Sequence, residues 1–212
     1  MTTVGGGRRR LLVGLGAAVV VVYLLLLAYI LWGDLPDARS AATAGPAGPD
    51  TPSEAVELWP AYEQAREAAQ AVAQDAQLLS ASTQWEGVGE QMFAGVGNWS
   101  FVFYAPASGR VLDVVVGGEW ARVVNQTRIW TTPQALAAGA WEEGPRDALL
   151  IFMAYGGQAF LARHPQAVVD LRLAPGEGGG AVWTVAALAT GGQGPLSVTV
   201  DAATKQVLAS VP

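Results

Sequence analysis

The sequence predicts an α+β fold, in which a single N-terminal transmembrane helix precedes two units that each combine a helix with an antiparallel sheet. Three observations support this prediction. An uncharged apolar run lies near the N-terminus, a helical pattern is followed by alternating strands, and the second half of the chain repeats that order. Because such strands have one apolar face, each helix should cover one face of a sheet.

The apolar run, Leu11–Trp32, contains no charged residue. As a helix of 22 residues it would extend about 33 Å, enough to cross a hydrocarbon core of about 30 Å. Arg8, Arg9 and Arg10 precede it, whereas Asp34 and Asp37 follow. The positive-inside rule therefore predicts a single-pass protein of the cell membrane, with residues 1–10 in the cytoplasm and the C-terminal domain outside.

A cleaved signal peptide is the main alternative for this run. Signal peptides usually have an apolar region of about 7–15 residues, which is shorter than Leu11–Trp32. The nearest Ala-x-Ala site, Ala42–Ala44, lies well beyond its end. A pilin-type helix fits less well, because the run lacks an early Glu and stops at Gly33. We therefore expect an uncleaved signal anchor in a bacterial cell envelope, because the Lys-poor, Ala-, Gly- and Arg-rich composition is typical of a high-GC bacterium.

Composition and charge exclude several classes of function. The chain has no Cys, one His and a net charge of −6, and residues from Gly33 onward carry 9 basic against 18 acidic side chains. Thiol chemistry and Cys-ligated metals are excluded, and a nucleic-acid partner is not expected. His164 lies between a helix end and Pro165, which gives it a structural role. We predict no enzyme activity, no catalytic residue, no cofactor and no metal site.

A linker and a first unit follow the membrane segment. Residues 33–53 contain four prolines and three glycines, which predicts an extended tether. Thr51 and Glu54 form a capping box that would start a helix, and Pro60 predicts a short first helix or a kink near Trp59. The expected apolar face of this helix is Leu58, Tyr62, Ala65, Ala69 and Val72.

The first unit, residues 54–124, should continue with strands at Gln77–Trp85, Trp99–Tyr104 and Val111–Val116, the last two forming a hairpin. A connector, residues 125–144, leads to the second unit, residues 145–212. There we expect a helix from Arg146 to Arg163 with Ala148, Phe152, Tyr155 and Ala159 on its apolar face, and then strands at Ala167–Leu173, Ala181–Ala189, Leu196–Val200 and Gln206–Ala209.

An internal repeat relates the two units. A shift of 84 residues places Trp99 on Trp183 without a gap. The same shift aligns further apolar positions: Leu112 with Leu196, Val114 with Val198, Val116 with Val200, and Val123 with Val207. The agreement of strand order, turn position and Trp placement indicates two related helix-plus-strand units.

The second unit resembles the PepSY and PepSY-like family. The resemblance rests on the helix, His164–Ala167, the strand that ends at Leu171–Leu173, Trp183, and the segment Leu196–Val207, which contains Asp201-Ala202-Ala203-Thr204. Lys205 stands where the family usually has Gly, and the first unit matches only in outline. The resemblance implies a non-catalytic extracytoplasmic module, often tethered to a membrane, that binds or restrains peptidases or other envelope proteins.

Tryptophans supply the candidate partner-binding residues. Core packing would explain most of the seven that follow the membrane segment. Trp120, Arg122, Arg128 and Trp130 alternate with apolar residues after the strong hairpin, and they are candidates for a groove or sheet edge that binds a partner. We therefore predict a membrane-anchored regulatory module that acts on another envelope protein, for example a peptidase or a membrane complex. The alternatives are a small-ligand carrier or enzyme that uses a pocket between helix and sheet, and a structural subunit of a membrane complex.

Overall fold

The computed structural model describes residues 55–137, 139–141, 144–189 and 194–211. The expected membrane helix Leu11–Trp32, the linker 33–53 and the capping box at Thr51 lie outside these residues. Within the described ranges, no helix is long and apolar enough to cross a membrane.

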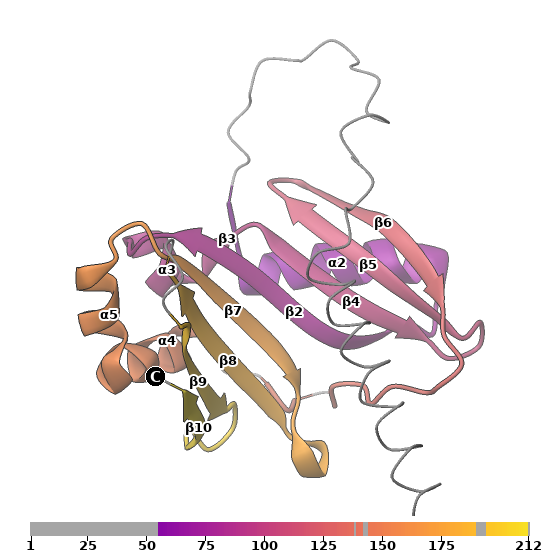
Figure 1. The fold of residues 1–212 in the computed structure, drawn as a ribbon. Coiled ribbons are helices and arrows are strands. Elements are labelled where there is room, and N and C mark those ends of the chain that lie inside the picture. The colour runs from indigo at the N-terminus through magenta and orange to yellow at the C-terminus, as the bar shows by residue number, and fades with distance from the viewer. Residues whose placement is uncertain (1–54, 138, 142–143, 190–193, 212) are drawn as a thin grey trace, which may run out of the picture. The chain divides into compact units, whose positions relative to one another are not determined.

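A single eight-stranded antiparallel sheet organises the fold, so the two units share one sheet (Figure 1). The strand order is β10-β9-β8-β7-β2-β4-β5-β6, with β2 paired to β7 in the middle and β6 and β10 outermost. The mixed α+β class predicted from the sequence is confirmed. The strands of this sheet are β2 (Gln77–Glu86), β4 (Trp99–Ala105), β5 (Arg110–Gly117), β6 (Trp120–Arg128), β7 (Val168–Pro175), β8 (Ala181–Leu188), β9 (Leu196–Asp201) and β10 (Val207–Val211).

The strand registers show that the 84-residue repeat is structural. Trp99 lies opposite Val116 in the β4–β5 pair, and Trp183 lies opposite Val200 in the β8–β9 pair, 84 residues later on both strands. The shift does not extend to the last strands, because Val123 lies opposite Val114 whereas Val207 lies opposite Val200. Six residues lie between the paired Val200 and Val207, two more than the four between the paired Val116 and Ala121, which accounts for this difference.

The strand pairing in the middle of the sheet is that expected if an approximate two-fold axis relates the two units. Ser82 of β2 pairs with Ser100, and Arg172 of β7 pairs with Thr184. Ser100 and Thr184 are equivalent in the repeat, so Ser82 and Arg172 are equivalent too. These two residues also lie directly opposite each other where β2 meets β7. The equivalence from β2 to β7 is therefore a shift of 90 residues, six more than for the later strands.

Helix α2 (Leu58–Val72) packs against β4, β5 and β6. It begins directly after the short strand β1 (Val56–Glu57), which pairs with β3 (Val96–Gly97). The expected interruption by Pro60 is wrong, because Pro60 lies in the first turn, where the backbone N–H groups have no partner within the helix. Ala61, Ala65 and Ala69 are fully buried and allow close packing on the sheet.

The helix expected at Arg146–Arg163 is present but broken. It consists of α4 (Arg146–Phe152), the π-helical turn η2 (Met153–Gly157) and α5 (Gln158–Arg163), with Gly156 at φ 104°. The extra residue in this turn rotates the buried face. Tyr155 and Ala159, expected in the core, are exposed, and Phe160 and Leu161 are buried instead.

Two short elements interrupt the strand connections. Helix α3 (Glu90–Ala94) lies between β2 and β3, and the 3-10 turn η3 (Glu177–Gly179) lies between β7 and β8. The connector after β6 is held by Leu136, whose N–H donates to the carbonyl of Leu78 at 2.8 Å. Trp141 stacks on Trp59 of α2 with ring centroids 4.6 Å apart, which fixes the connector beneath the helix.

The core lies between the helices and one face of the sheet. Phe101, Phe103, Leu112, Val114 and their counterparts in the second unit are buried on this face. The alternate residues face the other side of the sheet, where polar side chains such as Ser100 are exposed. Of the tryptophans in the described ranges, four are buried and three are exposed: Trp85, Trp99, Trp141 and Trp183 against Trp59, Trp120 and Trp130.

Candidate binding sites

The predicted partner-binding residues lie along the outermost strand β6. Trp120 is 53% exposed and Trp130 is 89% exposed, and both arginines of the set are exposed. Trp120 and Arg122 point away from α2, because Ala121 and Val123 between and beside them lie opposite buried residues of β5. Core packing therefore does not account for Trp120 and Trp130.

The four residues do not form one compact cluster, and they do not all share one face of the sheet. Trp120 and Arg122 lie on the face without a helix, whereas Arg128 lies opposite Arg110, on the face of the buried Leu112 and Val114. The guanidinium of Arg128 lies 5.3 Å from the ring centroid of Trp130, within cation–π range. Trp120 and Arg122 lie near the start of β6, about 26 Å and about 20 Å respectively from Arg128 for a strand that rises about 3.3 Å per residue. A bulge between Asp113 and Val114 of β5 separates these two ends. β6 continues to Arg128, four residues beyond residue 124, where the first unit was expected to end.

The edge is locally basic in an acidic chain. Arg110 on β5 lies directly opposite Arg128, and its Nη1 donates to Oε1 of Gln126 at 3.3 Å. The ion pairs seen in the described part of the chain join Arg66 to Glu63 and Lys205 to Asp147. Neither Arg122 nor Arg128 takes part in them, so both charges are available to a partner.

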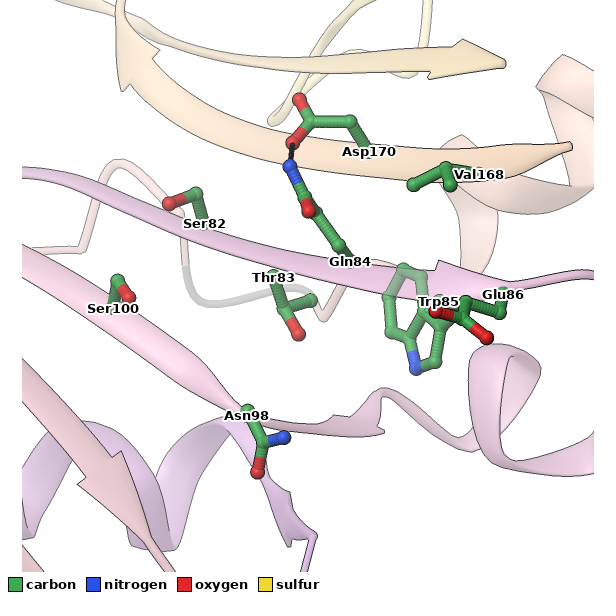
Figure 2. Close-up of a pocket in the computed structure, with 9 residues that line it drawn as sticks. All are labelled: Ser82, Thr83, Gln84, Trp85, Glu86, Asn98, Ser100, Val168 and Asp170. Atoms are coloured by element: carbon green, nitrogen blue, oxygen red, sulfur yellow. Dashed lines mark hydrogen bonds between the residues drawn. The ribbon is translucent and has the colours of Figure 1, made fainter. Parts of the chain in front are cut away.

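A second site, which the sequence did not reveal, is a pocket of about 490 Å³ in the sheet itself (Figure 2). Pairing of β2 with β4 ends at Ser82 and Ser100, although β2 continues to pair with β7 as far as Glu86. Beyond Ser82 the chain on the β4 side turns away, and the pocket occupies the gap. Its lining residues are Ser82, Thr83, Gln84, Trp85, Glu86, Asn98, Ser100, Val168 and Asp170.

Side chains alternate along β2, so its lining residues form a rim on the face without a helix and a floor on the buried face. Ser82, Gln84 and Glu86 belong to the face of β2 that carries no helix, and Thr83 and Trp85 belong to the buried face. Gln84 Nε2 donates to Oδ1 of Asp170 across the β2–β7 pair at 3.0 Å (Figure 2). Trp85 Nε1 donates to the carbonyl of Val96 at 2.7 Å and so anchors the diverted chain.

Thr83 is the polar residue of the floor. It is 3% exposed, and its hydroxyl has no hydrogen-bond partner among the described residues. In Figure 2 its side chain extends from β2 toward the side on which Asn98 lies. Gly97 lies close to it, since a Cβ on Gly97 would be 2.4 Å from the Thr83 hydroxyl. The missing side chain at Gly97 is what leaves room for Thr83.

The turn that carries the PepSY resemblance is held by Asp201. Its Oδ1 accepts hydrogen bonds from the N–H of Ala203 at 3.0 Å, the N–H of Thr204 at 2.7 Å and the Thr204 hydroxyl at 2.9 Å. The bonds from Thr204 and Ala203 lower the pKa of the Asp201 carboxyl below its ordinary value of 3.8. Lys205 has φ 62°, the left-handed conformation that favours Gly, and its Nζ pairs with Asp147 Oδ2 at 2.6 Å.

Three further places bear on possible chemistry, namely His164, groups of metal-binding side chains, and the space between α4 and the sheet. His164 follows the last residue of α5. Its backbone N–H donates to the carbonyl of Phe160 at 3.0 Å, and the centroid of its ring lies 4.8 Å from that of the Phe160 ring. In the described ranges, no three His, Cys, Asp or Glu side chains gather as a metal site. Between α4 and the strands β8 and β9, a space of about 10 Å³ beside Trp183 has room for about one water molecule.

Comparisons with known proteins leave the family open. No family model matches the chain, and no curated protein matches it. A solved structure described as a "putative lipoprotein" from Clostridium difficile 630 is similar at 10% sequence identity and a TM-score of 0.45, over 71% of this chain and 91% of that chain. A likeness at this level carries no information about function.

Proposed function

We propose that this chain is a membrane-anchored, extracytoplasmic and non-catalytic module that binds another cell-envelope protein through the β6 edge. The partner contributes an extended, acidic segment that pairs with β6 as a ninth strand. The observation that carries the proposal is the long outer strand, with exposed indoles near both ends and, between them, two arginines that form no ion pair among the described residues. The membrane anchor is the apolar run Leu11–Trp32.

The geometry of an outer strand supports strand addition. An outermost strand presents backbone N–H and C=O groups that a further strand can bond, and soluble proteins usually keep such edges short or covered. β6 is nine residues long, whereas the opposite outer strand, β10, has five. In peptide recognition by strand addition the backbone supplies affinity, and side chains that alternate along the edge supply specificity. Trp120 and Trp130 would hold the two ends of the partner segment.

The charge of the β6 edge supports an acidic partner segment. Arg122 and Arg128 lack a carboxylate partner in the described residues, and Arg110 adds a third positive charge at the same edge. The rest of the domain is acidic, which disfavours a generally anionic partner surface and confines attraction to this strip. Complementary carboxylates would set the register of the added strand.

The resemblance to the PepSY family supports a non-catalytic role, and a peptidase or membrane complex is the partner that it suggests. The well-filled space between α4 and the second half of the sheet supports a binding module over a carrier or enzyme that uses that interface. The hydrogen bond and ring contact of His164 support its role as the end of a helix.

The test uses the full chain in its native membrane, with a photo-crosslinking residue in place of Thr127 on β6 or in place of Leu208 on β10. Both positions are exposed, so each should accept the probe. We expect a discrete crosslinked envelope protein from β6 only, lost in an Arg122→Glu, Arg128→Glu variant and retained in the matched Arg163→Glu variant. Equal crosslinking from β10, or crosslinking that survives the charge reversal, would exclude the β6 edge as the binding site.

A further inference from the structure

We propose that the pocket between β2 and β4 binds a cationic hydrogen-bond donor, namely an ammonium or guanidinium group. The group comes either from a free organic amine or from a basic side chain of a polypeptide. This inference does not rest on the proposed function. The pocket lies at the middle of the sheet, on the face that carries no helix, whereas the β6 edge lies at its end and is positively charged.

The second unit provides an internal control for the pocket. There β7 and β8 pair without interruption from Val168–Leu188 to Pro175–Ala181. The repeat places the equivalents of Pro175 and Ala181 at Trp85 and Gly97 in the first unit, yet these residues do not pair. The intervening segment is six residues longer in the first unit and forms α3 and β3. The gap between β2 and β4 is therefore specific to the first unit, because the equivalent strands β7 and β8 pair without interruption.

Thr83, in the floor of the pocket, also differs from its equivalent in the second unit. Its equivalent in the second unit is Leu173, which is fully buried and apolar. A buried hydroxyl without a partner costs about 1–3 kcal/mol relative to one that is satisfied, and an apolar side chain at this position avoids that cost. The first unit thus keeps, in the floor of its gap, a polar atom that the second unit does without. A bound ligand that donates a hydrogen bond would satisfy it.

The lining sets the sign and chemistry of the ligand. Glu86 and Asp170 bring two carboxylates, and none of the nine lining residues is Lys, Arg or His. Because Gln84 uses its amide nitrogen on Asp170, its Oε1 remains to accept a hydrogen bond. Together with the Thr83 hydroxyl, these groups form an acceptor-rich, anionic surface. An ammonium has three N–H donors and a guanidinium has five, so both match it, whereas an anion would be repelled.

The size of the pocket favours an organic cation over a bare metal ion. A volume of about 490 Å³ exceeds what one coordinated ion fills, and the described residues hold no cluster of three metal-binding side chains. Trp85 adds an apolar wall at the floor, against which an alkyl chain can pack. The expected ligand is therefore an alkyl chain that ends in a charged donor.

The test is calorimetric titration of the purified full chain with 1,5-diaminopentane and with the blocked peptide acetyl-Gly-Lys-Gly-amide. The acetyl-lysine form of the peptide and glucose serve as neutral probes. We expect saturable 1:1 binding of the diamine, of the lysine peptide or of both. Binding of the diamine alone identifies a free amine as the source, and binding of the peptide identifies a side chain. Neither neutral probe should bind.

Variants locate the binding. Glu86→Gln and Thr83→Val should each weaken binding of the cationic probe at least tenfold, and Thr83→Val should keep or raise the melting temperature, since it removes only an unpaired hydroxyl. Asp113→Asn is the matched control, because Asp113 lies on the same face of the sheet, on β5, outside the pocket, and its Oδ2 is bonded to Asn125. The Arg122→Glu, Arg128→Glu variant should bind normally, which separates this site from the β6 edge.

Three results would overturn the proposal. The first is no saturable binding of either cationic probe. The second is binding of glucose or acetyl-lysine as strong as that of the cations, which would show a site that does not recognise charge. The third is equal weakening by Asp113→Asn and Glu86→Gln, which would show that the cations bind the general negative charge of the domain.

Discussion

The two units share one framework and differ in what has been added to it. In the first unit, α2 is continuous, the sheet opens after Ser82, and the last strand is long and exposed. In the second unit, the helix is broken at Gly156, the sheet is closed, and the last strand is short. Both candidate binding sites therefore lie mainly in the first unit, and Val168 and Asp170 of β7 in the second unit complete the lining of the pocket. The comparison indicates that the second unit mainly completes the sheet, while the first carries most residues of the two proposed binding sites.

The equivalent tryptophans Trp99 and Trp183 also differ between the two units. The indole of Trp99 donates to the carbonyl of Gly95 at 3.1 Å, whereas the indole nitrogen of the equivalent Trp183 has no partner among the described residues. Gly95, with φ 68°, ends α3 in the segment that only the first unit contains. The hydrogen bond from Trp99 thus holds the inserted segment to the core. The equivalent Trp183 lacks such a bond among the described residues, so a comparison of the two tryptophans measures what the bond contributes to stability.

The largest expected effect is the loss of either equivalent indole from the core. Trp99 and Trp183 are 0% and 2% exposed, so Trp99→Ala and Trp183→Ala should each destabilise the domain by about 3–5 kcal/mol. Because the two units share one sheet, each variant should unfold the whole domain in one transition. Urea denaturation followed by tryptophan fluorescence and by circular dichroism checks both points. Two separate transitions would mean that the units are stable independently.

A smaller change separates the two positions. Phe in place of Trp keeps most of the apolar surface but removes the indole N–H. At residue 99 this also leaves the carbonyl of Gly95 without its donor, so Trp99→Phe should cost about 1–2 kcal/mol more than Trp183→Phe. The same urea titrations measure the difference. Equal costs at the two sites would show that the Gly95 contact contributes nothing to stability.

Much of the framework could be predicted from the sequence, because it is encoded locally. Alternating apolar residues located the strands of both hairpins, and the matched tryptophans located the repeat. The sequence left core packing and an exposed groove open for Trp120 and Trp130; their exposure excludes core packing, while their binding of a partner stays a prediction. The errors at Pro60 and Tyr155 were also local, since a proline in a first turn and a π-helical turn have weak sequence signals.

The pocket could not be predicted, because it depends on which strands pair. Nothing in the segment Thr83–Glu86 indicates that β2 meets β7 on one side and loses β4 on the other. The relevant comparison, Thr83 with Leu173, needs a shift of 90 residues, whereas the visible repeat has a shift of 84. The inserted segment between β2 and β4 therefore concealed the equivalence until the register was known.

A fall in pH should weaken the β9–β10 turn and not the β5–β6 turn, because Asp201 has no counterpart in the β5–β6 turn, where Gly117 stands. The folded pKa of Asp201 is lowered by its hydrogen bonds, so its contribution to stability is present above the ordinary value of 3.8 and is lost as the pH falls through the folded value. Asp201→Ala, which removes the acceptor oxygen, should cost about 1 kcal/mol at about pH 7, as for a lost capping side chain, and less near about pH 3. Urea denaturation at both pH values measures this; a cost that does not change with pH would contradict it.

The smallest effect concerns Lys205, which occupies a left-handed position with a side chain that also makes an ion pair. A non-glycine residue in this conformation costs about 1–2 kcal/mol. Lys205→Gly removes that cost, but it forfeits an ion pair worth about 0.2–1 kcal/mol between half-exposed groups, and it loosens the unfolded chain by about 0.4–1 kcal/mol. These terms nearly cancel, so Lys205→Gly should lie within about 0.5 kcal/mol of the parent protein.

Lys205→Ala isolates the terms, because alanine loses the ion pair and keeps the strained backbone. It should be less stable than the parent by about 0.5 kcal/mol and less stable than Lys205→Gly, since alanine is poorly accommodated at positive φ. Asp147→Ala, which removes this ion pair from the other side, should lower the stability by no more than Lys205→Ala does. Thermal unfolding of the three variants gives the order directly. If Lys205→Gly were the least stable, the ion pair would outweigh the backbone, and the turn would depend on Lys205 and not merely tolerate it.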